Sequence, residues 1–165
     1  MELVDDALKK FEAVVPYGEE AFMVLRAHLL AEHHLFGYVS SRVANPEFMK
    51  EVESRYSPVG SGLGLILLAQ ALSLRDEVPP ACSDVLWPAL KALNELRNRL
   101  AHELHPDQGR IVKQMEKFVQ LALGESVAPS GNLNQTFYAC AQMIVAYLAI
   151  DRQPLTGDDT LPYPH

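Results

Sequence analysis

The chain has 165 residues, of which 48% are hydrophobic and 21% are charged, and its net charge at pH 7 is −7. This length suits one domain with a substantial core and is too short to predict two. The negative charge argues against a broad DNA-binding surface, because contacts with the phosphate backbone need clustered lysines and arginines. The two cysteines, Cys82 and Cys140, lack metal-ligand spacing, so we expect two thiols in a reducing cytosol.

The N-terminus and the apolar stretches of the sequence predict a cytoplasmic protein. The chain begins with Met-Glu-Leu-Val-Asp-Asp, which is acidic and lacks the basic and apolar regions of a signal peptide. The longest apolar stretch, residues 63–74, is shorter than the run of about 20 residues that a membrane-spanning helix needs. We therefore expect no membrane partner.

Helical patterns dominate the first half of the chain. The apolar spacing predicts helices over residues 3–15, 19–43 and 63–75, with a further short helix over 46–56. Residues 63–75 are apolar nearly all round, which is typical of a buried central helix. The segment 60–64 is rich in glycine, but no strand precedes it and no Lys-Ser/Thr follows it. We therefore expect a flexible connector there and no phosphate-binding loop.

The second half of the chain has the same character. A helix is expected from near Ser83 or Asp84 to Leu104, with Pro88 in or near its first turn. Two more are expected over 107–123 and 133–150, and the proline-containing segment 153–165 is expected as an extended or disordered tail. No alternating run is long enough for a sheet. The prediction is one all-α domain over residues 1–152, built as a bundle of about five to six helices.

Arg97 breaks the apolar pattern of the helix that carries it. At about 100° per residue, the apolar side chains of this helix gather on one face, which consists of Leu90, Leu93, Leu96, Leu100, Ala101 and Leu104. Arg97 projects into that face, and a polar arc lies directly beside it, formed by Asn94, Asn98, His102 and His105. A guanidinium on an apolar face is costly unless an anionic or polar group meets it. The sequence thus predicts either a buried ion pair, with Glu32 or Glu20, or a cleft in which Arg97 meets a ligand.

The segment Arg97-Asn98-Arg99-Leu100-Ala101-His102 resembles the R-x4-6-H signature of the HEPN superfamily, with four residues between Arg97 and His102. The layout around the segment is also similar to that of the superfamily. A long early helix carries an acidic residue, Glu32, near its middle, and a loop rich in small residues and an apolar helix precede the motif helix. The resemblance covers roughly residues 20–123 and is nearest to the small HEPN proteins around the mannitol operon repressor. It implies a HEPN-like helical bundle.

The HEPN resemblance implies a metal-independent endoribonuclease without a cofactor, of the kind that serves as a toxin or phage-defence effector. It implies that His102 is the general base or acid, that Arg97 holds the scissile phosphate, and that Asn98 supports either group. These residue types suit the chemistry, because cleavage of RNA without a metal needs proton transfer and a cation beside the developing charge. Supporting candidates are Glu32, Asn94 and His105.

The resemblance also implies partners. A homodimer with two motif helices facing one cleft would supply two histidines, and single-stranded or looped RNA is the expected substrate. A toxin would also have an antitoxin or effector protein as partner. DNA is not expected, because no basic recognition helix is visible. Leu104 stands where toxins paired with a nucleotidyltransferase antitoxin carry a tyrosine, so silencing through that tyrosine is not expected.

Two alternatives stay open beside the ribonuclease interpretation. The first is a non-catalytic regulator or partner-binding module related to the mannitol operon repressors, with His102 as an exposed residue near a helix C-terminus. The second concerns metal binding. His28 and Glu32 lie four residues apart, next to His33 and His34, but no metal signature is present, so we expect structural or exposed histidines. Trp87 is expected in the core and not as a platform for stacking bases.

Overall fold

The computed structural model of the chain describes residues 2–15, 20–43, 62–73, 80–102, 107–124 and 131–150. Within these ranges the secondary structure is entirely helical, which confirms the prediction of an all-α bundle of five to six helices. The helices are α1 (Glu2–Val14), α2 (Glu20–Ser40), α4 (Gly62–Ser73), α5 (Pro80–His102), α6 (Gln108–Leu123) and α7 (Leu133–Ile150). The helix predicted over 46–56, the tail 153–165 and His105 lie outside the described residues.

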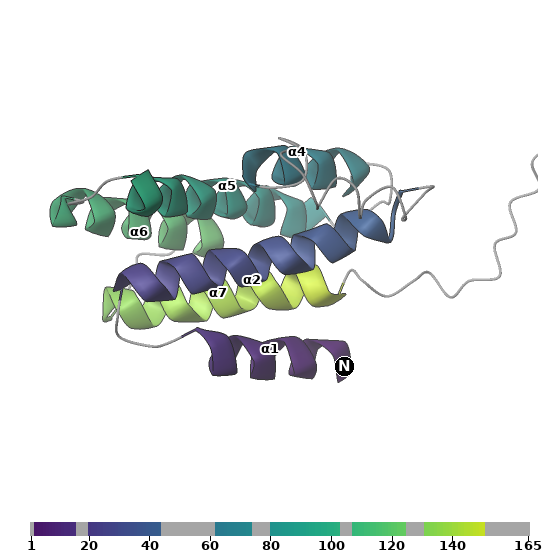
Figure 1. Ribbon diagram of the computed structural model, residues 1–165, viewed down its shortest axis with the longest axis horizontal. Helices are drawn as coiled ribbons and strands as arrows, with labels where there is room; N and C mark the ends of the chain where they lie inside the picture. The colour runs from purple at the N-terminus through teal and green to yellow at the C-terminus, as the bar shows by residue number, and fades with distance from the viewer. Residues whose placement is uncertain are drawn as a thin grey trace, which may run out of the picture.

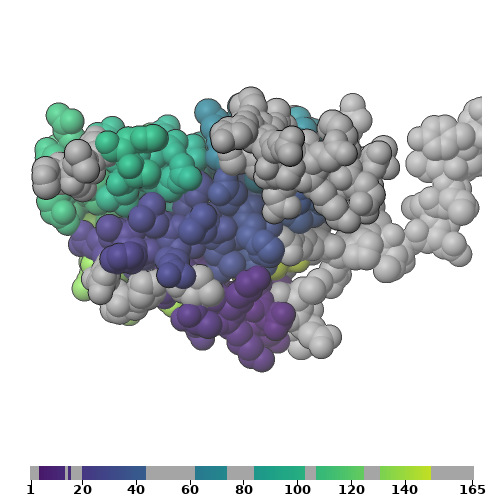
Figure 2. Space-filling model, viewed as in Figure 1, coloured from purple at the N-terminus to yellow at the C-terminus, as the bar shows by residue number. Residues whose placement is uncertain are grey.

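Helix α2 occupies a central position in the bundle (Figure 1). It packs against α7 along its length, against α4 and α5 on another side, and more lightly against α1. The hairpin of α5 and α6 and the pairing of α1 with α7 complete the layers. In the space-filling view, α2 forms the middle of one face, between α1 and residues of the α5–α6 region (Figure 2). Side chains of α2 can therefore contribute both to the core and to a surface site.

The core is built largely from aliphatic and aromatic side chains. The rings of Phe118 and Phe137 lie 4.8 Å apart between α6 and α7, and both side chains are fully buried. On the other side of the bundle, the ring of Phe11 meets that of Tyr138 edge-on at 5.1 Å. Trp87 is buried, as its apolar helical position predicts. None of the described helices is long and apolar enough to cross a membrane.

Helix α4 differs from the buried central helix that its sequence predicts. The side chains of Leu63 and Leu67 are 48% and 49% exposed, while Leu65, Ile66 and Ala69 are buried. The reason lies in the packing, because α4 lies at the outside of the bundle and packs mainly against α2 and α5 among the described helices (Figure 1). One face of this apolar helix therefore remains uncovered by the described part of the chain. Residues 62–64, expected in a flexible connector, form its first turn.

Helix α5 begins at Pro80, earlier than the predicted start at Ser83 or Asp84. Proline is well tolerated at the first helical position, because the N–H that it lacks would have no partner within the helix. As a consequence, Pro88 lies inside the helix and not in its first turn, so the prediction for this residue was also wrong. The buried face of α5 nevertheless follows the predicted pattern, with Leu90, Leu93 and Leu96 in the core.

Candidate functional site

Arg97 lies at the border of the apolar face of α5. Leu93 and Leu96 are buried, but Arg97 and Leu100 are only partly buried and Ala101 is exposed. The apolar stripe that the sequence predicts therefore leaves the core near Leu96. Arg97 projects where the helix emerges from the bundle, so its guanidinium avoids most of the cost of burying a charge.

Two members of the predicted trio come together in the structure. The Nη1 atom of Arg97 donates a hydrogen bond to Oδ1 of Asn98 at 2.8 Å. Both side chains are partly buried. The amide oxygen thus holds the guanidinium at one edge, while the remaining N–H groups of Arg97 stay available because a guanidinium carries five donors.

The third member, His102, lies apart from the other two. Its side chain is exposed at the last residue of α5, one helical turn beyond Asn98. No hydrogen bond between described residues joins His102 to Arg97 or Asn98. The three residues therefore lie near the same end of α5, but hydrogen bonds do not join all three. We call Arg97, Asn98 and His102 the arginine site.

The ion pairs considered for Arg97 do not form. Glu20, the first residue of α2, accepts hydrogen bonds from Gln108 of α6 and Asn134 of α7. Glu32 accepts a hydrogen bond from the backbone N–H of Gly62, at 2.6 Å to Oε1. In the part of the chain that the structure describes, Arg97 pairs with no carboxylate.

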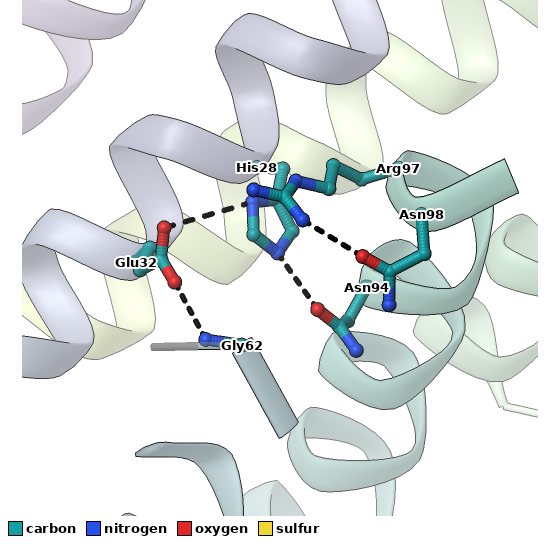
Figure 3. A network of polar contacts seen from close by, with 6 residues as sticks. All are labelled: His28, Glu32, Gly62, Asn94, Arg97 and Asn98. Carbon is teal, nitrogen blue, oxygen red and sulfur yellow. Dashed lines mark hydrogen bonds and ion pairs between the residues drawn. The ribbon is translucent and has the colours of Figure 1, made fainter. Parts of the chain in front are cut away.

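A second polar group lies next to the arginine site and joins three helices (Figure 3). It consists of His28 and Glu32 from α2, Gly62 from α4 and Asn94 from α5, and we call it the polar junction. The Nε2 atom of His28 lies 3.2 Å from Oδ1 of Asn94, within hydrogen-bond distance. The Nδ1 atom of His28 lies 4.0 Å from Oε2 of Glu32, too far for a direct hydrogen bond.

Gly62 is required at its place in the polar junction for two reasons. Its φ of +54° lies in the left-handed region, which side chains with a Cβ atom rarely adopt. A Cβ atom at this position would also lie only 3.1 Å from Oδ1 of Asn94. At the first residue of α4, the backbone N–H thus binds Glu32, while a side chain would be strained by the backbone and crowded against Asn94.

His28 is almost fully buried, at 4% exposure, and Asn94 is 5% exposed. Burial lowers the pKa of His28 from its ordinary value of 6.5, and the nearby positive charge of Arg97 lowers it further. The charge of Glu32 and the hydrogen bond with Asn94 oppose this shift. The net direction is downward, so the ring is neutral at pH 7. Its Nδ1 atom makes no hydrogen bond within the described residues.

A small cavity of about 10 Å³ adjoins the polar junction. Its polar lining comes from His28, Glu32 and Gly62, and the rest of the lining is apolar: Ala31, Leu35, Ile66 and Leu90. This volume corresponds to roughly one water molecule. The cavity is too small for a nucleotide, so a substrate would meet the arginine site from the surface of the molecule.

The histidines on α2 serve different purposes. His33 is exposed, with Nε2 at 3.5 Å from Nζ of Lys10, whereas His34 is buried and meets the ring of His33 edge-on. Over the described ranges, no three His, Cys, Asp or Glu side chains are grouped so that they could hold a metal ion. His28 and Glu32 both belong to the polar junction.

Sequence reasoning named Glu32 and Asn94 as supporting residues but treated His28 only as a weak metal candidate. The structure brings all three together. A signal was present in the sequence, because His28 and Glu32 lie one helical turn apart and Asn94 lies one turn before Arg97.

Comparison of the chain with protein-family models, curated proteins and solved structures finds no match.

Proposed function

We propose that this protein is a metal-independent endoribonuclease of HEPN type that acts as a homodimer. One observation carries the proposal: the guanidinium of Arg97 is partly exposed, is held by Asn98, and pairs with no carboxylate of the described residues. Arginine in this state has donors left for a phosphodiester, which it can hold through two parallel hydrogen bonds. His102, with its exposed imidazole, lies one turn further along the same end of α5.

The residues of the arginine site suit each step of RNA cleavage by the neighbouring hydroxyl. An imidazole of His102 takes the proton of the 2′-hydroxyl, the 2′-oxygen forms a bond to phosphorus, and the bond from phosphorus to the 5′-oxygen breaks. Arg97 stabilises the negative charge that develops on the phosphoryl oxygens. His102 of a second copy returns a proton to the 5′-oxygen. The products are a 2′,3′-cyclic phosphate and a free 5′-hydroxyl, with no metal required.

A second copy of the chain would complete this site. Four large apolar side chains are about half exposed: Phe22 and Leu29 on α2, and Leu63 and Leu67 on α4. Because α2 and α4 pack together, these side chains offer apolar surface that dimerisation would remove from water. The HEPN resemblance adds a biological role to the proposal: a toxin or phage-defence effector in the cytoplasm, with an antitoxin or effector protein as partner.

RNA cleavage in EDTA tests the proposal. Purified wild-type protein is incubated with a fluorescent single-stranded RNA, next to Arg97→Ala and His102→Ala variants. Each variant is expected to lose roughly 100-fold or more in cleavage rate. The matched controls are Arg110→Ala and His33→Ala, which remove an exposed arginine and an exposed histidine outside the site and should cleave like the wild type. Equal cleavage by wild type and both site variants, or no cleavage by the wild type, contradicts the proposal.

A second candidate function is a non-catalytic module that binds a protein partner. The exposed apolar side chains of α2 and α4 favour it, since a partner protein could cover them as well as a second copy could. The two functions differ in their expected results. A partner-binding module does not cleave RNA, and it forms with a different protein a stable complex that persists in Arg97→Ala and His102→Ala but weakens when Leu63 and Leu67 are replaced by serine.

A further inference from the structure

We propose that His28 is a positioning residue of the arginine site: through its hydrogen bond with Asn94, it fixes the face of α5 that carries Arg97 and Asn98. This inference rests on the proposed ribonuclease function, and it adds a residue that has no contact with the substrate. His28 belongs to α2 and Asn94 to α5, so the bond crosses between two helices whose relative placement decides where Arg97 projects.

The position of Asn94 on α5 connects the polar junction to the arginine site. Residues three and four apart on a helix lie on the same face in adjacent turns, so Asn94 lies beside Arg97 and Asn98. Figure 3 shows Asn94, Arg97 and Asn98 together on α5, with the side chains of Asn94 and Arg97 reaching toward His28 of α2. A change in the rotation of α5 that breaks the bond with His28 therefore also moves Arg97 and Asn98.

The Asn94 amide is bonded by His28 and leaves little space beside Gly62. His28 lies 3.2 Å from its Oδ1 atom, and Gly62 approaches the same atom so closely that a Cβ atom there would lie 3.1 Å away. Both His28 and Asn94 are nearly fully buried, which removes competition from water and makes the bond directional. Loss of the bond leaves a buried polar group unsatisfied, and α5 must shift to relieve it.

The charges around His28 agree with a positioning role. On α2, Glu32 faces His28 at 4.0 Å but is bound to the N–H of Gly62, and on α5 the positive charge of Arg97 lies near. A neutral ring can remain behind Arg97 without repelling it, and it does not compete with the phosphate for the guanidinium. His28 thus supports the site without joining its chemistry.

The test compares three uncharged replacements of His28. The amide nitrogen of glutamine falls near the ring Nε2 position, so His28→Gln keeps the bond with Asn94. The amide nitrogen of asparagine falls near Nδ1, so His28→Asn cannot reach Asn94, and His28→Leu fills the volume without any hydrogen bond. Cleavage of the same RNA in EDTA is measured as kcat and KM, together with the thermal midpoint of unfolding of each variant.

We expect His28→Gln to retain kcat within about 3-fold, whereas His28→Asn and His28→Leu lower kcat by about 10-fold or more with little change in KM, because misplacement by about 1 Å is costly for catalysis. The double variant His28→Leu/Asn94→Leu should lose no more than either single variant, since both break the same bond. His34→Leu is the matched control, because it buries a leucine on a different side of α2.

The outcomes separate this inference from the proposed function. If the wild type does not cleave RNA, the proposed function fails and the positioning role fails with it. If the wild type cleaves and Arg97→Ala does not, but His28→Asn cleaves as fast as His28→Gln, only the positioning role of His28 is overturned. If His28→Leu does not fold, the comparison of His28→Asn with His28→Gln still tests the positioning role of His28.

Discussion

The two sides of this bundle hold their helices together by different means. Between α6 and α7, the fully buried rings of Phe118 and Phe137 make an apolar contact. Where α2, α4 and α5 meet, polar groups are joined instead: the buried side chains of His28 and Asn94 are bonded to each other, and the partly buried Glu32 is bonded to Gly62. Apolar contacts are non-directional, whereas buried hydrogen bonds contribute little net stability but penalise any arrangement that leaves them unmade.

This difference assigns a separate role to each side. The α6–α7 contact stabilises the fold and tolerates small shifts of one helix against the other. The polar junction tolerates few arrangements, and it lies beside the one described arginine that the sequence places on an apolar stripe. We infer that the apolar side determines how stable the bundle is, and that the polar junction determines where Arg97 projects.

The largest loss of stability is expected on the apolar side. Phe118→Ala removes a fully buried ring and should lower the free energy of unfolding by about 3–5 kcal/mol, because the cavity is only partly filled by relaxation. Urea unfolding measures the change. Phe22→Ala is the control: its side chain is 55% exposed, so a change of only about 0.5 kcal/mol is expected. A similar loss in both variants would mean that the α6–α7 contact does not dominate stability.

Gly62→Ala should produce the next largest effect, through the polar junction. The left-handed backbone costs about 1–2 kcal/mol for a residue with a Cβ atom, and the close approach to Asn94 adds strain. Gly109→Ala in α6 is the matched control, because its Cβ atom would meet only an ordinary contact of 3.4 Å and an ordinary helical backbone. It should be neutral or stabilise by about 0.4–1 kcal/mol. If both alanine variants unfold at the same urea concentration, Gly62 is not required at the junction.

How much of the difference between the two sides of the bundle could be predicted depends on how far apart in the sequence the interacting residues lie. The helical periodicity predicted the bundle and the buried face of α5, because that pattern is local. The closeness of the Arg97 and Asn98 side chains in space also followed from the sequence, because the two residues are neighbours in the chain. The bond between His28 and Asn94 joins residues 66 positions apart, and it depends on how α2 packs against α5, which periodicity does not specify.

Two errors of prediction have similar causes. Helix α4 is apolar nearly all round, and its sequence does not say that the described part of the chain would leave Leu63 and Leu67 half exposed. Pro88 was placed in or near a first turn because proline is well tolerated there, yet α5 begins at Pro80 and continues through Pro88. In both cases the local pattern alone did not determine how the helix is placed.

A smaller, pH-dependent effect is expected from His28. In the unfolded chain this histidine takes up a proton near its ordinary pKa of 6.5, whereas burial lowers its pKa in the folded protein. Between these two values the unfolded chain binds more protons, so stability falls as the pH decreases through this window and is fully present above it. Unfolding in urea from pH 7.5 to 5 should show a steeper loss for the wild type than for His28→Gln. Parallel curves would mean that the pKa of His28 is the same in the folded and the unfolded protein.

The smallest effect is expected from a contact that belongs to neither side of the comparison. Nζ of Lys117 on α6 lies 2.9 Å from Oε2 of Glu95 on α5, but both side chains are 54% exposed. Water screens such a pair, so a double-mutant cycle with Glu95→Gln and Lys117→Met should give a coupling energy of about 0.2–1 kcal/mol that decreases in 1 M salt. A coupling above about 2 kcal/mol that is insensitive to salt would require an effectively desolvated pair. In that case, the difference in burial between the polar junction and the exposed pair would not explain why polar contacts restrict the helices at the junction but not at the surface.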